Sequence, residues 1–300
     1  MKKHITLNGE TFLFASGYRE DVVLYTKANQ LAQTIFGISF DDWKSEGGWD
    51  DTFCPYTLFD LSGNAVSNVF VSFHTMLEDG KPKRYLQLNA VMTAAPYRKK
   101  GLARFIIDQI IAEHGEAADQ IFLFANDSAA DFYRACGFTA VKESEFYQRE
   151  LEFQQGETLV KLDTHTAEGR HEILTAIEQS VPTSRLYIER MNSLCLLVML
   201  WGGDYFYRIP SLDAMVALEE EGDVIFLRDV FSSQAIPLEQ IVRALPTKEG
   251  QTLQLGFTPH ELTGWEIKPF IRRNSTTFLF SGKPLPLSGE PFRFQELCVS

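Results

Sequence analysis

A short basic segment, residues 98–103 with the sequence RKKGLA, has the residue types and spacing that bind an anionic ligand. Gly101 and Ala103 carry little or no side chain, so a phosphate group can approach their backbone closely. Unpaired amides and the positive end of the helix dipole would face that ligand if a helix starts here. Together with Arg104 just beyond it, the segment also supplies four cationic side chains. The pattern therefore predicts a binding site for a diphosphate.

The flanking segments place this loop between a strand and a helix. Residues 86–92 form an apolar run that predicts a strand, and residues 102–114 have the apolar spacing of an amphipathic helix. A second apolar strand is expected at residues 120–125. Taken alone, the loop is also what a basic turn capping a helix would contain, and it has neither a P-loop nor a dinucleotide-fold glycine pattern. The order strand, loop, helix, strand favours the binding site.

Over residues 10–150 this order of motifs resembles the GCN5-related N-acetyltransferase (GNAT) superfamily. Residues 98–103 match its pyrophosphate loop, Arg/Gln-x-x-Gly-x-Gly/Ala, and Asn126, Phe132-Tyr133 and Gly137-Phe138 match the segment after its fifth strand. The resemblance implies a mixed α/β (α+β) fold with a central mixed sheet flanked by helices. It also implies acetyl-CoA as co-substrate and no metal.

The resemblance assigns roles to individual residues. The pantetheine arm would pair with the backbone of the fourth strand and meet an Asn after the fifth, and the diphosphate would lie on the loop. The expected cofactor-binding residues are Val91, Met92, Thr93, Arg98, Lys99, Lys100, Gly101, Leu102, Ala103, Arg104 and Asn126. Tyr133 would lie near the thioester sulfur and is the candidate catalytic acid. The alternative is a structural tyrosine that packs its helix on the sheet.

The general base is not identified by the sequence. Many members of the family carry a Glu on the fourth strand, whereas this strand offers only Gln87 and Asn89. An Asp or Glu near the acceptor cleft, a water chain through Asn89, and a neutral amine that needs no base all remain open.

Composition and charge restrict the partners. The 300 residues carry a net charge of −12, which argues against nucleic acid because phosphate backbones need clustered Lys and Arg. The apolar run at residues 194–201 is too short to span a membrane. Four scattered cysteines without metal or disulfide spacing favour a reducing cytoplasm. We expect a cytoplasmic monomer or homodimer, with no nucleic acid or membrane partner.

Length and pattern predict two domains, residues 1–155 and 156–300. In the first, we expect strands at residues 10–16, 54–61 and 66–77, a helix at 21–36, an irregular stretch at 37–51, and a closing strand from 147 to about 156. The second half repeats the order strand, turn, strand, helix, strand, but residues 231–236 (FSSQAI) replace the basic loop. It is expected to be a degenerate GNAT-like copy that forms one wall of the acceptor cleft. Coincidence is the alternative, since this order is common.

Two functions follow from the resemblance. The favoured one is an acetyl-CoA-dependent N-acetyltransferase that acts on a small amine or a peptide amine, with one cofactor per chain. The other is a non-catalytic acyl-CoA sensor or interaction protein, which the absent Glu on the fourth strand favours. The acceptor is not readable, because acceptor pockets are made by variable loops.

Overall fold

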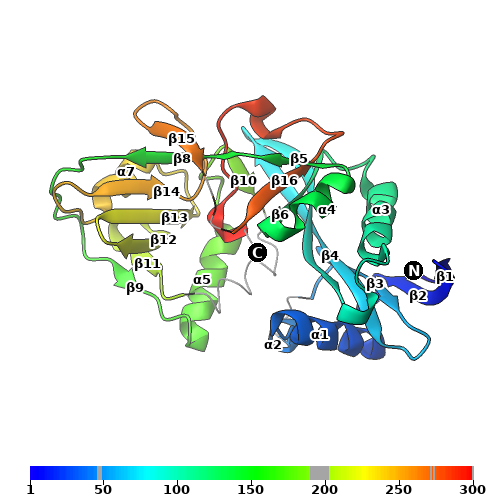
Figure 1. Ribbon diagram of the computed structural model, residues 1–300. Coiled ribbons are helices and arrows are strands. Elements are labelled where there is room, and N and C mark those ends of the chain that lie inside the picture. Colours follow the sequence, from blue (N-terminus) through cyan, green and yellow to red (C-terminus); the bar gives the residue numbers. More distant parts are fainter. Residues whose placement is uncertain (46–48, 190–202, 271, 273, 299–300) are drawn as a thin grey trace.

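The protein consists of two mixed β-sheets lying side by side, each with helices packed against it (Figure 1). The computed structural model describes residues 1–45, 49–189, 203–270, 272 and 274–298. The helices of the first half are α1 (Val22–Phe36), α2 (Asp41–Ser45), α3 (Leu102–His114) and α4 (Ala130–Ala135), and those of the second half include α5 (Ala167–Gln179) and α7 (Leu238–Ala244).

In the first sheet, strands from both ends of the chain meet. Its strand order is β1 (Lys2–Leu7), β2 (Glu10–Ser16), β3 (Phe53–Phe59), β4 (Ala65–Glu78), β5 (Lys81–Thr93), β6 (Gln120–Ala125), β16 (Thr276–Phe280) and β7 (Phe138–Val141), and β10 (Leu186–Ile188) pairs with β4. Among the described strands of this sheet, only β5 and β6 run parallel, and α3 joins them.

The second sheet repeats this arrangement. Its order is β15 (Glu266–Phe270), β8 (Glu143–Gln148), β14 (Thr252–Leu255), β13 (Val224–Ser232), β12 (Ala214–Glu221), β11 (Phe206–Ile209) and β9 (Val160–Lys161). Here β13 and β14 form the parallel pair, and α7 joins them. The antiparallel pair beside each parallel pair contains a register shift, in β4–β5 and in β12–β13.

Strands β8 and β16 each join the sheet formed mainly by the other half of the chain. β8 follows β7 in the sequence but pairs with β14 and β15 of the second sheet. In return, β16 follows β15 but pairs with β6 and β7 of the first sheet. The boundary expected near residue 155 thus divides the sequence without dividing the sheets. The closing strand expected from residue 147 to about 156 is β8, which lies earlier and belongs to the second sheet.

Local sequence explains the helices beside the first sheet. The Asp21 carboxylate accepts a hydrogen bond from the Leu24 amide at 3.0 Å and caps α1, which ends at the left-handed Gly37. The apolar stripe of α3 includes Ile106 and Ile110, which are fully buried against β4 and β5. Part of the stretch expected to be irregular, residues 37–51, is helical as α2, whose Trp43 is buried.

Two groups of residues pack on the face of the first sheet that lies opposite α3. Helices α1 and α2 lie over an aromatic cluster that includes Trp49, Phe53 and Phe70. Residues near the C-terminal end of the described chain cover the rest, where Phe294 stacks on Phe122 of β6 with ring centroids 4.6 Å apart. The second half therefore contributes two strands, β10 and β16, and part of the core to the first sheet.

Candidate functional site

Strands β5 and β6 pair for a short distance and then separate. The parallel pairing covers Tyr85 to Gln87 of β5, whereas β5 stays paired with β4 as far as Thr93. Ala90 has a positive φ of 41°, at the register shift between these two strands. From Leu88 onward, one backbone edge of β5 therefore has no strand partner among the described residues. Such an edge can bind an extended ligand through its N–H and C=O groups.

The three predicted residues of β5 lie on this open segment. The Val91 side chain packs toward the α3 core, and that of Met92 is buried in the α1 core. The Thr93 hydroxyl lies 2.9 Å from that of Ser67. All three side chains are engaged in the fold, so a contribution to ligand binding comes from the backbone.

The predicted diphosphate loop follows at the same end of β5. Lys99 and Gly101 both adopt left-handed conformations, with φ of 61° and 77°, and they bend the chain into α3. The first backbone hydrogen bond of α3 runs from the Phe105 amide to the Gly101 carbonyl at 3.0 Å. The amides of residues 102–104 have no partner in the described chain, as expected at a helix start. A Cβ atom on Gly101 would meet no atom within 4 Å.

The cationic side chains of the loop differ in their partners. Arg98 folds back and donates from Nε to the Thr93 carbonyl at 3.1 Å, and Lys100 pairs with Glu10 at 2.6 Å. Arg104 lies 3.9 Å from Asp108, and Lys99 is exposed. Lys99 and Arg104 are therefore the cations most available to an anion.

A contact between the loop and the β1–β2 turn was not anticipated from the sequence. Besides the Glu10 ion pair, the Asn8 side chain donates to the Lys100 carbonyl at 2.8 Å. The turn contains Asn8-Gly9, a pair typical of tight hairpins. That signal predicts the hairpin, but nothing local indicates that its partner lies some 90 residues away.

Asn126 and Tyr133 follow β6. Asn126 is exposed, and its side chain makes no hydrogen bond to the described residues. Tyr133 of α4 is buried at 6% exposure, and its ring contacts Phe132, Phe138 and Phe278. Because β5 and β6 are parallel, their carboxyl ends place residues 91–93, the loop and Asn126 at the same edge of the sheet.

The environment of Tyr133 keeps its hydroxyl protonated. Burial raises the pKa of this phenol well above its ordinary value, and Cys136 adds to the effect. A protonated phenol has the form that a proton donor needs. The same ring is packed against β16 through Phe278, so the structural role considered from the sequence is present as well.

Gln87 and Asn89, the two polar residues noted on this strand in the sequence, are part of a buried polar row. The Gln87 side chain lies 3.1 Å from Nε2 of His74, and Asn89 donates to the Ser72 hydroxyl at 2.7 Å. Burial lowers the pKa of His74 to about 4, so this imidazole is neutral near neutral pH. The row presents hydrogen-bonding groups without a carboxylate.

The counterpart of the loop in the second half has different chemistry. Helix α7 begins after Pro237, which has no amide hydrogen, and Glu239 lies in its first turn. The adjoining pocket of about 500 Å³ is lined by Trp265, His260, Glu261 and other residues, none of them Lys or Arg. A carboxylate and a missing amide oppose diphosphate binding.

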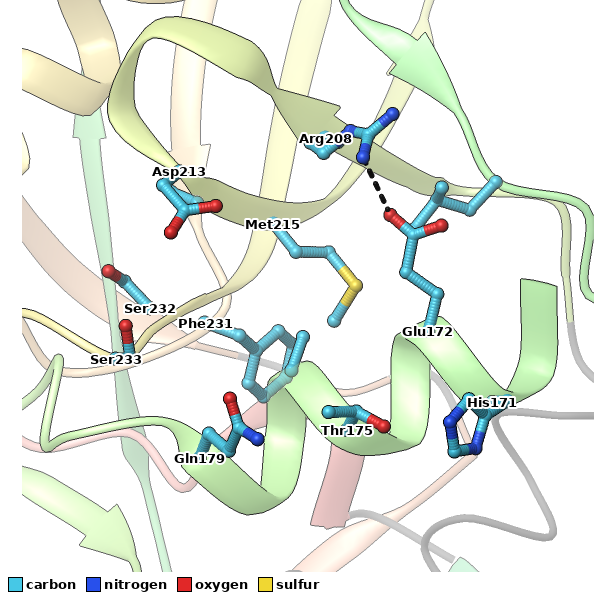
Figure 2. A pocket seen from close by; sticks show the side chains of 13 residues that line it. His171, Glu172, Thr175, Gln179, Arg208, Asp213, Met215, Phe231, Ser232 and Ser233 are labelled. Atoms are coloured by element: carbon cyan, nitrogen blue, oxygen red, sulfur yellow. Dashed lines mark ion pairs between the residues drawn. The ribbon is translucent and has the colours of Figure 1, made fainter. Parts of the chain in front are cut away.

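A second pocket in this half lies between α5 and the ends of β12 and β13 (Figure 2). Its volume is about 340 Å³, and Met215 and Phe231 lie at its centre. An ion pair between Glu172 and Arg208, with atoms 3.3 Å apart, forms one side. Sequence reasoning missed this pocket because its walls come from segments that are far apart in the chain.

None of the helices in the described ranges is long and apolar enough to cross a membrane. Within the same ranges, no three His, Cys, Asp or Glu residues are grouped so that they could hold a metal ion. The apolar run at residues 194–201 lies outside the described residues.

Comparisons with known proteins agree with this geometry. Residues 65–158 match the family model described as an acetyltransferase (GNAT) domain. Two solved structures share the fold at low identity. One is a protein from Enterococcus faecalis described as a "Probable N-Acyltransferase", with 11% identity and a TM-score of 0.55. The other is a GCN5-related N-acetyltransferase from Kribbella flavida, with 12% identity and a TM-score of 0.50. A search of curated proteins found no match.

Each of these two alignments covers 89% of this chain and 71% of the other. The similarity of fold therefore extends over both sheets. The mixed sheet with a separating parallel pair, and a basic loop at the start of the joining helix, define a GNAT-type fold. The match to the GNAT domain model, over residues 65–158, includes this loop and both strands of the parallel pair.

Proposed function

We propose that the protein is an acetyl-CoA-dependent N-acetyltransferase that modifies the amine of a small molecule or a peptide. The observation that carries this proposal is the left-handed loop at Lys99 and Gly101, which opens α3 with unpartnered amides beside the free edge of β5. A diphosphate on the loop would direct the pantetheine arm along residues 91–93 and toward Asn126. The GNAT domain match supports the same assignment.

The reaction requires the protein to align two ligands and to handle two protons. The amine attacks the thioester carbon, the carbon–sulfur bond breaks, the amine loses a proton and the thiolate gains one. Free N–H groups of the β5 backbone near residues 91–93 would stabilise the developing oxyanion. Tyr133 would protonate the departing thiolate. The acceptor amine would lose its proton to water or to a base still to be identified.

A second function, a non-catalytic acyl-CoA sensor, is favoured by one observation. The row formed by His74, Gln87, Ser72 and Asn89 lacks the carboxylate base that many GNAT enzymes carry on this strand. Retention of Tyr133 and Asn126 favours the enzyme.

The two functions are separated by incubating the protein with acetyl-CoA and a panel of amines while free thiol is measured. Amine-dependent release of thiol supports the enzyme. Binding of acetyl-CoA by calorimetry, without thiol release for small amines or for peptides with a free amino terminus, supports the sensor. Absence of acetyl-CoA binding would contradict both functions.

A further inference from the structure

The pocket between α5 and the second sheet has a carboxylate on one side and an ion pair on the other. Figure 2 shows Asp213 and Ser232 on one side, and the Glu172–Arg208 pair on the other. Within the described residues, the Asp213 carboxylate has no hydrogen bond or ion pair. Arg208 meets Glu172 through Nη1, which leaves further N–H groups of its guanidinium for an acceptor.

The spacing of these charges suits a compact ligand. Arg208 of β11 is paired with Met215 of β12, and Asp213 stands two residues before Met215. Asp213 itself lies just before β12, in a left-handed conformation with φ of 48°, and it lines the same pocket of about 340 Å³ as Arg208. A molecule that carries an ammonium and a carboxylate a few atoms apart can therefore reach both side chains at once.

The centre of the pocket is apolar. Met215 and Phe231 are 3% and 1% exposed, and Leu162 and Ala176 add to the lining. Thr175, Gln179 and Ser232 supply neutral hydrogen-bonding groups around it. Small-molecule sites combine an apolar centre with a few polar groups in this way, and 340 Å³ is near the lower end of their size range.

We propose that this pocket binds a small zwitterion with an apolar side chain, the chemistry of a free apolar α-amino acid. Its carboxylate meets Arg208, its ammonium meets Asp213, and its side chain lies on Met215 and Phe231. The proposal is independent of the acetyltransferase function. Because Pro237 and Glu239 stand where a diphosphate loop would be needed, the site binds its ligand without transferring an acyl group to it.

L-leucine is a suitable probe, tested by calorimetry on the full chain. Leucinamide lacks the carboxylate and 4-methylpentanoate lacks the ammonium, so each removes one of the two charge contacts. We expect leucine to bind, and each analogue to bind about tenfold or more weakly. Asp213→Asn and Arg208→Gln should weaken leucine binding by a similar factor. Both residues are exposed, so these changes leave the core intact.

Arg243→Gln is the matched control. It removes an exposed arginine that is ion-paired with Glu239 on α7, outside the pocket lining, and leucine binding should be unchanged. Absence of leucine binding to the folded wild type would overturn the proposal. So would leucinamide or 4-methylpentanoate binding as tightly as leucine, or wild-type affinity in both pocket variants.

Discussion

Gly101 and Gly80 have nearly the same backbone conformation at opposite ends of β5. Their φ values are 77° and 75°, and a Cβ atom on either would meet no atom within 4 Å. A valine at either position carries the same left-handed strain. The two sites differ only in their surroundings, since Gly101 lies in the basic loop and Gly80 in the β4–β5 turn.

We therefore predict that Gly101→Val weakens acetyl-CoA binding by at least about tenfold, because its side chain enters the space of the diphosphate and blocks the amides. Gly80→Val should lose a comparable amount of stability and keep wild-type affinity. Calorimetric titration measures both affinities, and thermal unfolding compares the stabilities. Equal affinities in the two variants would remove the assignment of the loop.

Tyr133→Phe is predicted to lower kcat about tenfold or more while acetyl-CoA affinity stays within twofold, since the hydroxyl acts only on the departing thiolate. The phenylalanine keeps the ring contacts with Phe132, Phe138 and Phe278. Steady-state kinetics and calorimetry on the same preparation test this. Unchanged kcat across the pH range would leave Tyr133 with its packing role alone.

His74 should make the fold sensitive to acid. Its folded pKa of about 4 lies below the ordinary 6.5, so the unfolded chain binds the proton more tightly. The stability contributed by neutral His74 is fully present above pH 6.5 and is lost as the pH falls toward 4. The loss amounts to about 2 kcal/mol at pH 5. Urea unfolding near pH 7.5 and pH 5 should show this loss in the wild type and a smaller one in His74→Gln. Identical losses would contradict the assignment.

Asp229 of β13 has the opposite effect on the pH dependence of stability. Burial raises its pKa to about 7 in the folded protein, while Gln295 donates to its carboxyl at 2.8 Å. Its contribution is present below pH 4 and is lost as the pH rises toward 7, by up to about 4 kcal/mol. Asp229→Asn should therefore gain stability relative to the wild type between these pH values. A pH-independent difference in urea unfolding would be inconsistent with a protonated Asp229.

At the scale of elements, β16 links the two halves energetically. Phe278 is fully buried between β6 and β7 and contacts Tyr133. Phe278→Ala should lower the free energy of unfolding by about 3–5 kcal/mol, the usual cost of removing a buried phenylalanine. Phe153→Ala is the control, because Phe153 is 71% exposed and its loss should cost under about 0.5 kcal/mol. If Phe278→Ala and Phe153→Ala unfolded at similar denaturant concentrations, β16 would contribute little to the stability of the protein.

Elements specified by local pattern were predicted from the sequence, and pairings between distant segments were not. The helix at residues 102–114 and the strands at 10–16 and 120–125 are confirmed, because apolar periodicity and glycine or polar breaks mark their ends. β16 reads as a strand as well, with its Thr-Thr-Phe-Leu-Phe sequence. Its place between β6 and β7 depends on contacts across the whole chain, which periodicity does not contain.

In the candidate site, too, local features were predicted from the sequence and contacts between distant segments were not. The loop and Asn126 belong to a continuous segment, so the sequence places them at one sheet edge. The tether from Asn8 and Glu10, the contact of Phe278 with Tyr133, and the pocket at Asp213 each join segments that are far apart. No short motif encodes such contacts.

At the scale of the molecule, β8 and β16 cross between the halves, so each sheet contains strands from both halves of the chain. We predict that the full chain unfolds in a single calorimetric transition, and that residues 1–155 expressed alone do not fold, because β16 is then missing from the first sheet. A dispersed amide spectrum and cooperative unfolding of the fragment would refute this. The domain boundary at residue 155 was inferred from a repeated order of elements in the sequence, and it stays a prediction.

Binding stoichiometry belongs to the same scale. One acetyl-CoA per chain is predicted, since among the described residues only the first half combines a basic loop with an unpartnered helix start. Pro237 and Glu239 occupy the corresponding place in the second half. Calorimetric titration of the full chain gives the ratio directly. Two equivalent sites would contradict this division of roles.

The exchanged strands also affect how the chain folds during synthesis on the ribosome, because paired strands emerge at different times. β6 and β7 emerge early, yet the strand that fills the space between them comes more than a hundred residues later. Until then, two apolar strand edges stay open in the nascent chain, the kind of edge that leads to wrong pairing and aggregation. Ribosome-bound chains stopped before β16 should be cut readily by protease and should bind chaperones, while chains that extend past it are protected.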